Sequence, residues 1–85
     1  MASEITEYSA RLIRAVKAEL ARRDVPGSAL IPVLGISKNS LYSRLRFERS
    51  FETDELAKIV DYLDMDMDAL FASAALDSKP KVLAA

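Results

Sequence analysis

The amino-acid sequence predicts an all-α protein built as one domain of five helices. Apolar residues recur at intervals of three and four along most of the chain, which is the period of a helix. No alternating run predicts a strand, and only two glycines and three prolines interrupt the 85 residues. A chain of this length suits a single small core. We expect the domain to occupy residues 1–76 and a flexible tail to occupy residues 77–85.

The first expected helix runs from Ser3 to Arg23. Either Ser3 or Thr6 can serve as its N-cap, and the segment from Asp24 to Gly27 ends it. The positions that recur at helical spacing are Ile5, Tyr8, Leu12, Ile13, Val16 and Leu20. We expect this stripe to face the core.

The second expected helix, from Gly27 to Leu34, contains Pro32. Proline inside a helix removes a hydrogen bond and clashes with the carbonyl four residues earlier, at a cost of about 3 kcal/mol. The cost falls if the proline lies in the first turns. We therefore expect a short or irregular helix here.

The third expected helix runs from Lys38 to Phe47, after a turn at Gly35 and an N-cap at Ser37. Leu41 and Leu45 are four residues apart and face the core. The other side carries Asn39, Ser43 and Arg46, with Ser40 and Tyr42 at its edges. Arginine pairs with guanine, asparagine with adenine, and serine with either base, so this face suits the major groove of DNA. An ordinary amphipathic helix with a solvated polar face is the alternative.

Two further helices complete the predicted domain. The fourth begins at Thr53, which we expect to cap it, and has an apolar stripe at Leu56, Ile59, Val60 and Leu63. The fifth begins at Asp66 and ends at Ala75 or Leu76. Its inward-facing residues are expected to be Met67, Leu70 and Phe71.

The net charge of −1 conceals a division along the chain. Residues 8–49 contain nine basic and three acidic residues, a net charge of +6, whereas residues 50–85 have a net charge of −5. A basic half beside an acidic half indicates one face for polyanions such as DNA. Charged but merely solvated faces are the alternative.

The missing residue types exclude several classes of protein. Without cysteine or histidine the chain has no disulfide, no thiolate nucleophile and no imidazole base or metal ligand. Two glycines cannot form a glycine-rich phosphate loop. An acidic run at residues 61–68 lacks the glycine and the terminal glutamate of a calcium loop. We therefore expect no enzyme, no metal and no cofactor.

No apolar run is long enough to span a bilayer, and the first residues lack the basic and apolar regions of a signal peptide. A soluble cytoplasmic protein without a membrane partner is the expectation.

Residues 5 to 75 resemble the helix-turn-helix domains of lambda-type repressors and Cro proteins, the xenobiotic-response-element-like class. The stretches that carry the resemblance are Leu30 through Gly35-Ile36-Ser37, then Ser43-Arg44-Leu45-Arg46, and Phe51 through Asp54-Glu55-Leu56 to Tyr62-Leu63. The last of these stretches resembles small regulators of actinobacterial phages and prophages. Two residues depart from the family pattern. Ile31 replaces the usual alanine where two helices cross, and together with Pro32 it is expected to change the angle between them. Phe47 replaces a glycine, which is expected to weaken the helix stop and let the third helix continue.

The resemblance implies a sequence-specific DNA-binding transcriptional regulator whose recognition helix, at about residues 38–47, occupies an operator and blocks polymerase. The expected DNA contacts are Ser37, Lys38, Asn39, Ser40, Tyr42, Ser43, Arg44 and Arg46. We expect Asn39, Ser43 and Arg46 to contact bases, and Ser37, Lys38 and Arg44 to anchor phosphates. The alternatives are partial burial for Tyr42 and an ion pair with Glu48 for Arg44. The alternative function is a protein-interaction module, such as an antitoxin or antirepressor.

The resemblance also implies a homodimer on half-sites about 34 Å apart. The surface residues expected to form it are Leu70, Phe71, Ala74 and Leu76, together with the exposed side of the first helix. Capping of the core is the alternative for Leu70 and Phe71. The final Leu83-Ala84-Ala85 resembles the end of a bacterial tag that directs proteins to AAA+ proteases, so such a protease is a further expected partner, with an accidental alanine-rich tail as the alternative.

Overall fold

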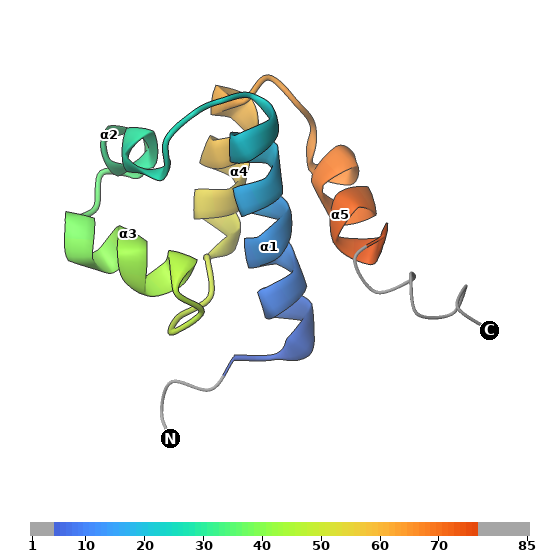
Figure 1. Cartoon of the computed structure of the whole chain (residues 1–85), viewed down its shortest axis with the longest axis horizontal. Helices are drawn as coiled ribbons and strands as arrows, with labels where there is room; N and C mark the ends of the chain where they lie inside the picture. Colours follow the sequence, from blue (N-terminus) through green and yellow to red (C-terminus); the bar gives the residue numbers. More distant parts are fainter. Residues whose placement is uncertain (1–4, 77–85) are drawn as a thin grey trace.

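A computed structural model describes residues 5–76, which form five α-helices and one short 3₁₀ helix (Figure 1). The elements are α1 (Glu7–Arg22), η1 (Gly27–Ala29), α2 (Leu30–Leu34), α3 (Lys38–Leu45), α4 (Thr53–Tyr62) and α5 (Met67–Leu76). The predicted all-α domain of five helices is confirmed. Ser3 as a helix cap and Leu83-Ala84-Ala85 as a protease handle lie outside the described residues.

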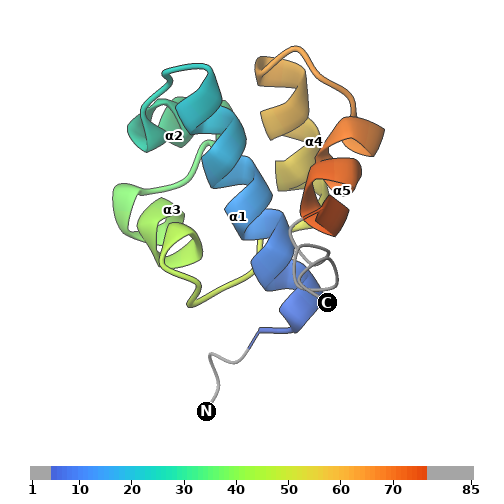
Figure 2. The ribbon, with the colours of Figure 1, turned by 45° about the vertical axis from the view of Figure 1, so that its right-hand side comes forward.

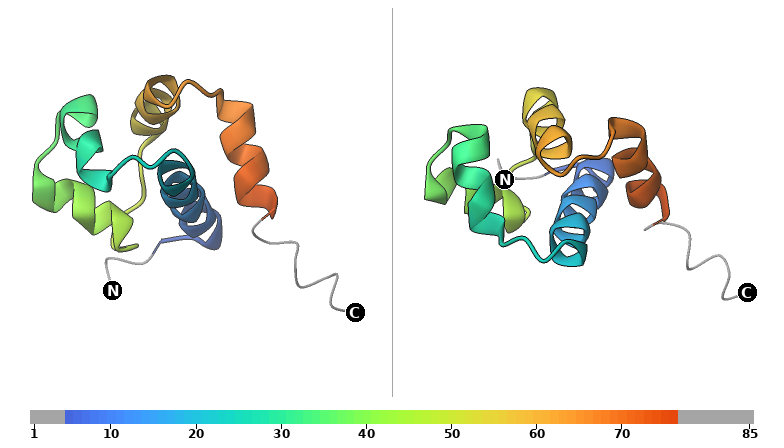
Figure 3. Two further views of the ribbon diagram at one scale, coloured as in Figure 1. Left: turned by 45° about the horizontal axis from the view of Figure 1, so that its top comes forward. Right: turned by 90° about the horizontal axis from the view of Figure 1, so that it is seen from above.

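Helices α1 and α4 lie in the middle of the molecule in Figure 1, and in the turned view of Figure 2 α1 stands between α3 and α5. The pair α2 and α3 lies on one side of them and α5 on the other, an arrangement that is also visible from above in Figure 3. Helix α1 packs mainly against α5, and α2 packs mainly against α4. Helix α3 is therefore separated from α5 by the width of the central helices.

One apolar core joins all five helices. Its buried members are Leu12, Ile13, Ala15, Val16, Leu20, Leu30, Leu34, Leu41, Leu45, Phe51, Leu56, Ile59, Val60, Leu63, Leu70 and Ala74. These include most of the predicted apolar stripes of the first, third and fourth helices. The prediction for Phe71 is wrong, because its side chain is 41% exposed. Leu70 and Ala74 define the buried side of α5, and the next position along the helix lies about 100° away from it.

Side-chain acceptors fix the starts of the helices. The Ser9 N–H donates to Thr6 Oγ1 at 3.0 Å, so Thr6 caps α1, and the Ala69 N–H donates to Asp66 Oδ1 at 2.9 Å. The N-cap of α4 is Glu52 rather than Thr53, which corrects the prediction. Glu52 has extended backbone angles, and its N–H donates to Glu55 Oε1 at 2.9 Å, so Thr53 becomes the first helical residue.

The second predicted helix divides into η1 and the five-residue α2. Pro32 is the third residue of α2, where its missing N–H has no helical partner to lose. The expected short and irregular helix is confirmed. The longest described helix, α1, has 16 residues, and none within residues 5–76 is long and apolar enough to cross a membrane.

Four chain reversals place a residue in the left-handed region one or two positions after the end of a helix. Their φ angles are 59° at Asp24, 67° at Gly35, 68° at Phe47 and 58° at Asp64. The expectation that Phe47 lets α3 continue is wrong, because α3 ends at Leu45. The Phe47 ring packs against the core, so burial of the side chain compensates for the left-handed backbone.

Candidate nucleic-acid interface

Three residues, Gly35, Ile36 and Ser37, connect α2 to α3. The Gly35 N–H closes α2 by donating to the Ile31 carbonyl at 2.9 Å, and its left-handed φ turns the chain. Ser37 Oγ then accepts the Ser40 N–H at 3.1 Å, as predicted for an N-cap. Both ends of the connection are therefore held by hydrogen bonds, and α3 begins at a defined place.

Helix α3 buries Leu41, Arg44 and Leu45 and presents its other polar side chains away from them. The predicted contact residues that lie at the surface are Ser37, Lys38, Asn39 and Arg46. Those that are half-buried are Ser40, Tyr42 and Ser43. The surface of α3 thus combines an amide, a hydroxyl and two cations.

Two of the half-buried side chains have local roles. The Ser43 hydroxyl donates to the Ser40 carbonyl at 2.8 Å, which leaves its oxygen as an acceptor. Tyr42 lines a groove between α1, η1 and α3. It is half-buried, as the alternative for this residue expected, but the groove is lined mainly by α1 and not by the second helix. The other residues of the groove are Lys17, Leu20, Ala21, Val25, Gly27 and Leu45.

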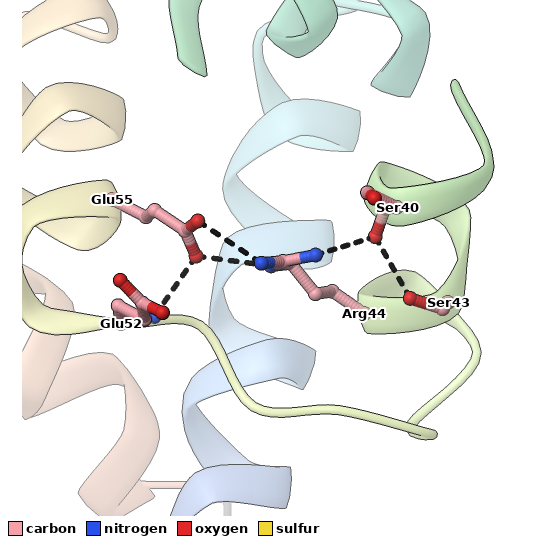
Figure 4. Close-up of polar contacts among 5 residues, drawn as sticks. All are labelled: Ser40, Ser43, Arg44, Glu52 and Glu55. Atoms are coloured by element: carbon pink, nitrogen blue, oxygen red, sulfur yellow. Dashed lines mark hydrogen bonds and ion pairs between the residues drawn. The ribbon is translucent and has the colours of Figure 1, made fainter. Parts of the chain in front are cut away.

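Arg44 is buried, with a side chain only 4% exposed. Figure 4 shows its side chain between Glu55 and Ser40. Its Nε and Nη2 donate to the two carboxylate oxygens of Glu55 at 2.9 and 3.1 Å, and its Nη1 donates to the Ser40 carbonyl at 2.7 Å. Glu55 in turn accepts the Glu52 N–H. Within residues 5–76 no buried side-chain polar atom lacks a hydrogen-bond partner.

This position corrects the interpretation of Arg44 as a phosphate contact. Arg44 follows Leu41 by three residues and therefore lies on the buried side of α3, where its guanidinium group is already engaged by Glu55 and Ser40. The alternative partner, Glu48, is also incorrect. Arg44 joins α3 to the first turn of α4. It therefore holds α3 in place and is not itself part of the exposed surface of the helix.

Arg46 is the C-cap of α3, with a side chain 57% exposed. Its Nε and Nη2 donate to the two carboxylate oxygens of Glu48 at 3.1 and 3.3 Å. The hydrogen bond with Arg46 lowers the pKa of Glu48, and the same hydrogen bond raises the pKa of Arg46. Arg46 and Glu48 are two residues apart in the sequence, and the turn at Phe47 brings their side chains together.

Lys17 on α1 holds the end of α3. Its Nζ donates to the Leu45 carbonyl at 3.1 Å and lies 5.0 Å from the centre of the Phe47 ring. A cation suits this position because the last carbonyls of a helix carry partial negative charge. This role of Lys17 could not be predicted from the sequence, because 28 residues separate it from Leu45 and no local pattern links them.

Ion pairs neutralise much of the basic half of the chain. Arg22 and Arg23 both bind the buried carboxylate of Glu19, and Glu7 lies 3.7 Å from Arg11 and 3.6 Å from Arg14. Arg44 and Arg46 pair with Glu55 and Glu48. Of the four paired carboxylates only Glu7 and Glu55 lie outside residues 8–49, so including them lowers the net charge of that half from +6 to +4. The exposed cations on α3 and directly after it are Lys38, Arg46 and Arg49.

In the acidic run at residues 61–68, Asp66 has a structural role, because its side chain caps α5. Among the described residues, no three acidic side chains are grouped so that they could hold a metal ion.

Comparison of the chain with known proteins finds no matching family model, no matching curated protein and no matching solved structure. What the α3 surface does must therefore be argued from its own residues.

Proposed function

We propose that this protein is a sequence-specific DNA-binding transcriptional regulator of the Cro or repressor type, similar to those of phages and prophages. In this proposal α2 and α3 form a helix-turn-helix, and α3 enters the major groove. The connection of three residues with a left-handed glycine supports it, because helix-turn-helix motifs use such a turn. Binding at an operator would exclude polymerase from the same DNA.

The exposed side of α3 is the observation that carries the proposal. Asn39 near its start and Arg46 at its end have the side chains that pair with adenine and guanine in the major groove. Ser37 and Lys38, at the first turn, suit phosphate oxygens, which fix the register of a protein on DNA. The buried Arg44 and Lys17 support this surface by tying α3 to α4 and α1.

A homodimer is part of the proposal, with α1 and α5 as its surface. Tyr8 and Phe71 are 50% and 41% exposed with ring centroids 6.4 Å apart, and Leu76 is 63% exposed. A groove beside them contains the small side chains of Ala15, Ala18 and Ser73, together with Arg14 and Leu76 itself. In a two-fold dimer, the exposed apolar side chains of each copy would fill the groove of the other copy. The fully buried Leu70 and Ala74 cannot take part, which narrows the predicted surface.

The same apolar surface also favours the second candidate function, a protein-interaction module such as an antitoxin or antirepressor. In that case Tyr8 and Phe71 would contact a different protein, and α3 would be an ordinary solvated helix. The extensive pairing of arginines is compatible with this function.

The dependence of DNA binding on salt separates the two functions. Duplexes that the protein selects from a random pool should share a motif, and their affinity should fall steeply as salt rises. Lys38→Ala should weaken binding to every duplex and reduce the slope of log K against log salt by about one. The matched control is Lys58→Ala, an exposed lysine on α4, which should change neither quantity.

Asn39→Ala should relax the preference at particular base pairs, with a cost of about 1–3 kcal/mol at those positions. A flat salt response together with no shared motif among selected duplexes would reject DNA binding and favour the protein-interaction module.

A further inference from the structure

Glu48 is the only acidic residue between Asp24 and Glu52, and it lies at the end of the surface proposed to contact DNA. A carboxylate at such a place repels phosphates. The proposed function does not explain why an acid occupies the position, and the structure suggests an answer.

The fold holds Glu48 beside Arg46. The Phe47 N–H donates to the Arg44 carbonyl at 3.0 Å, and the Glu48 N–H donates to the Ser43 carbonyl at 2.9 Å. With the left-handed φ of Phe47, these two bonds form the Schellman arrangement that closes a helix. Because the backbone is closed in this way, the Glu48 carboxylate stays within reach of the Arg46 guanidinium group.

The contact between Arg46 and Glu48 uses the part of arginine that recognises DNA. Two parallel N–H groups of Arg46 donate to the two oxygens of Glu48. The same fork matches a phosphate, or the O6 and N7 atoms of guanine. Both side chains are about half exposed, at 57% and 51%, so water screens the pair and a DNA group can replace the carboxylate.

The replaced carboxylate then determines which DNA is accepted. Where only phosphates are near, the Glu48 carboxylate finds no hydrogen-bond donor to accept from, and it repels the DNA backbone. Where a cytosine amino group is within reach, it can accept a hydrogen bond from N4, which is how Glu contacts bases. A guanine for Arg46 and a cytosine for Glu48 would therefore satisfy both members of the pair.

We propose that Glu48 is a specificity-determining residue that withholds Arg46 from the phosphates of arbitrary DNA and releases it at an operator that offers guanine and cytosine to the pair. This inference rests on the proposed function. It assigns to Glu48 a role in distinguishing the operator from other DNA and not in strengthening DNA binding.

The test compares two duplexes, one selected from a random pool by the unmodified protein and one with the same bases in shuffled order. Glu48→Gln should raise affinity for the shuffled duplex about tenfold and steepen its salt slope by about 0.9, the value for one added phosphate contact. Affinity for the selected duplex should rise less or fall, so the ratio of the two affinities decreases. In the Arg46→Gln background the gain for the shuffled duplex should be clearly smaller, because no guanidinium group remains to be released and only the repulsion by the carboxylate is removed.

Asp68→Asn is the matched control, because it removes one exposed negative charge from α5, on the far side of the central helices from α3 (Figure 1). It should leave the ratio unchanged. The proposal is wrong if Glu48→Gln changes both affinities equally or not at all, or if its effect on the shuffled duplex is as large in the Arg46→Gln background as in the unmodified protein. If the unmodified protein binds neither duplex in a salt-dependent way, the proposed function itself fails.

Discussion

At the scale of single residues, Arg44 differs most from its sequence-based interpretation. A buried ion pair stabilises a fold only when its hydrogen bonds offset the loss of water from both charges. Arg44 meets this condition, since Nε and Nη2 bind Glu55 and Nη1 binds the Ser40 carbonyl. Its neighbours in sequence contain no sign of this partner, because Glu55 lies 11 residues away on another helix.

Arg44→Met should lower the free energy of unfolding by about 3–5 kcal/mol, because it leaves the Glu55 carboxylate buried without its cation. The double variant Arg44→Met, Glu55→Gln removes that charge and keeps an oxygen for the Glu52 N–H. It should recover most of the loss. Urea unfolding followed by circular dichroism measures both, and a single variant within about 1 kcal/mol of the unmodified protein would contradict the structural role.

Glu19 makes the stability depend on pH. Burial opposes its ionisation, but hydrogen bonds from Arg22 and Arg23 outweigh burial and hold the pKa of Glu19 below its ordinary value of 4.5. Because the pKa is lower in the folded state than in the unfolded state, the ionised carboxylate stabilises the fold above this value. The contribution is lost as the pH falls through the lower pKa of the folded state.

The free energy of unfolding of the unmodified protein should therefore exceed that of Glu19→Gln by a constant amount near neutral pH. The difference should shrink only below about pH 4.5. Urea titrations of both proteins across this range provide the measurement. A difference that does not change with pH would show that Glu19 does not act through its charge.

At the scale of the elements, helix ranges were predicted well and helix ends less well. The apolar stripes located α1, α3 and α4 to within a few residues, because periodicity is a property of the local sequence. The caps depended on geometry that the local sequence leaves open. At α4 the extended backbone falls at Glu52 and not at Thr53, and at α3 a phenylalanine takes the left-handed position that usually favours glycine.

Asp64→Gly should stabilise the protein by about 0.5–1 kcal/mol, because it relieves a left-handed residue after α4. It also removes a negative charge from the negative end of that helix. Thermal unfolding would show the gain as a higher midpoint.

Gly35→Ala is the opposite test of backbone strain. A Cβ atom there meets nothing within 4 Å, so its cost, about 1 kcal/mol, should come from the left-handed backbone alone. If Asp64→Gly destabilised the protein and Gly35→Ala did not, the left-handed conformations would not control these helix ends.

At the scale of the whole molecule, charges and apolar surface are arranged differently from their order in the sequence. The basic and acidic halves meet across α3 and α4, where Glu55 neutralises Arg44. Three of the four large apolar side chains that are exposed among the described residues, Tyr8, Phe71 and Leu76, lie on α1 and α5. Helix α1 stands between α5 and α3 (Figure 2). A dimer formed through that surface would leave both copies of α3 exposed to DNA.

The unmodified protein should form a dimer whose population rises with concentration in sedimentation experiments. Phe71→Ser should shift the equilibrium toward the monomer, because it removes an exposed aromatic ring from the proposed interface. Tyr62→Ser is the matched control, since Tyr62 is 46% exposed at the end of α4 and lies outside that surface. A protein that stays monomeric at all concentrations would contradict the dimer.

The sequence by itself determined the number of helices, most of their apolar faces and the polar side of α3, because these follow from spacing along one chain. It also excluded thiol and imidazole chemistry, since the residues are absent. Only the tertiary structure decided which cations are available, because ion pairs depend on side chains that meet in space. Arg44 faces Glu55 across two helices, Lys17 reaches the end of α3, and the turn at Phe47 sets Glu48 against Arg46.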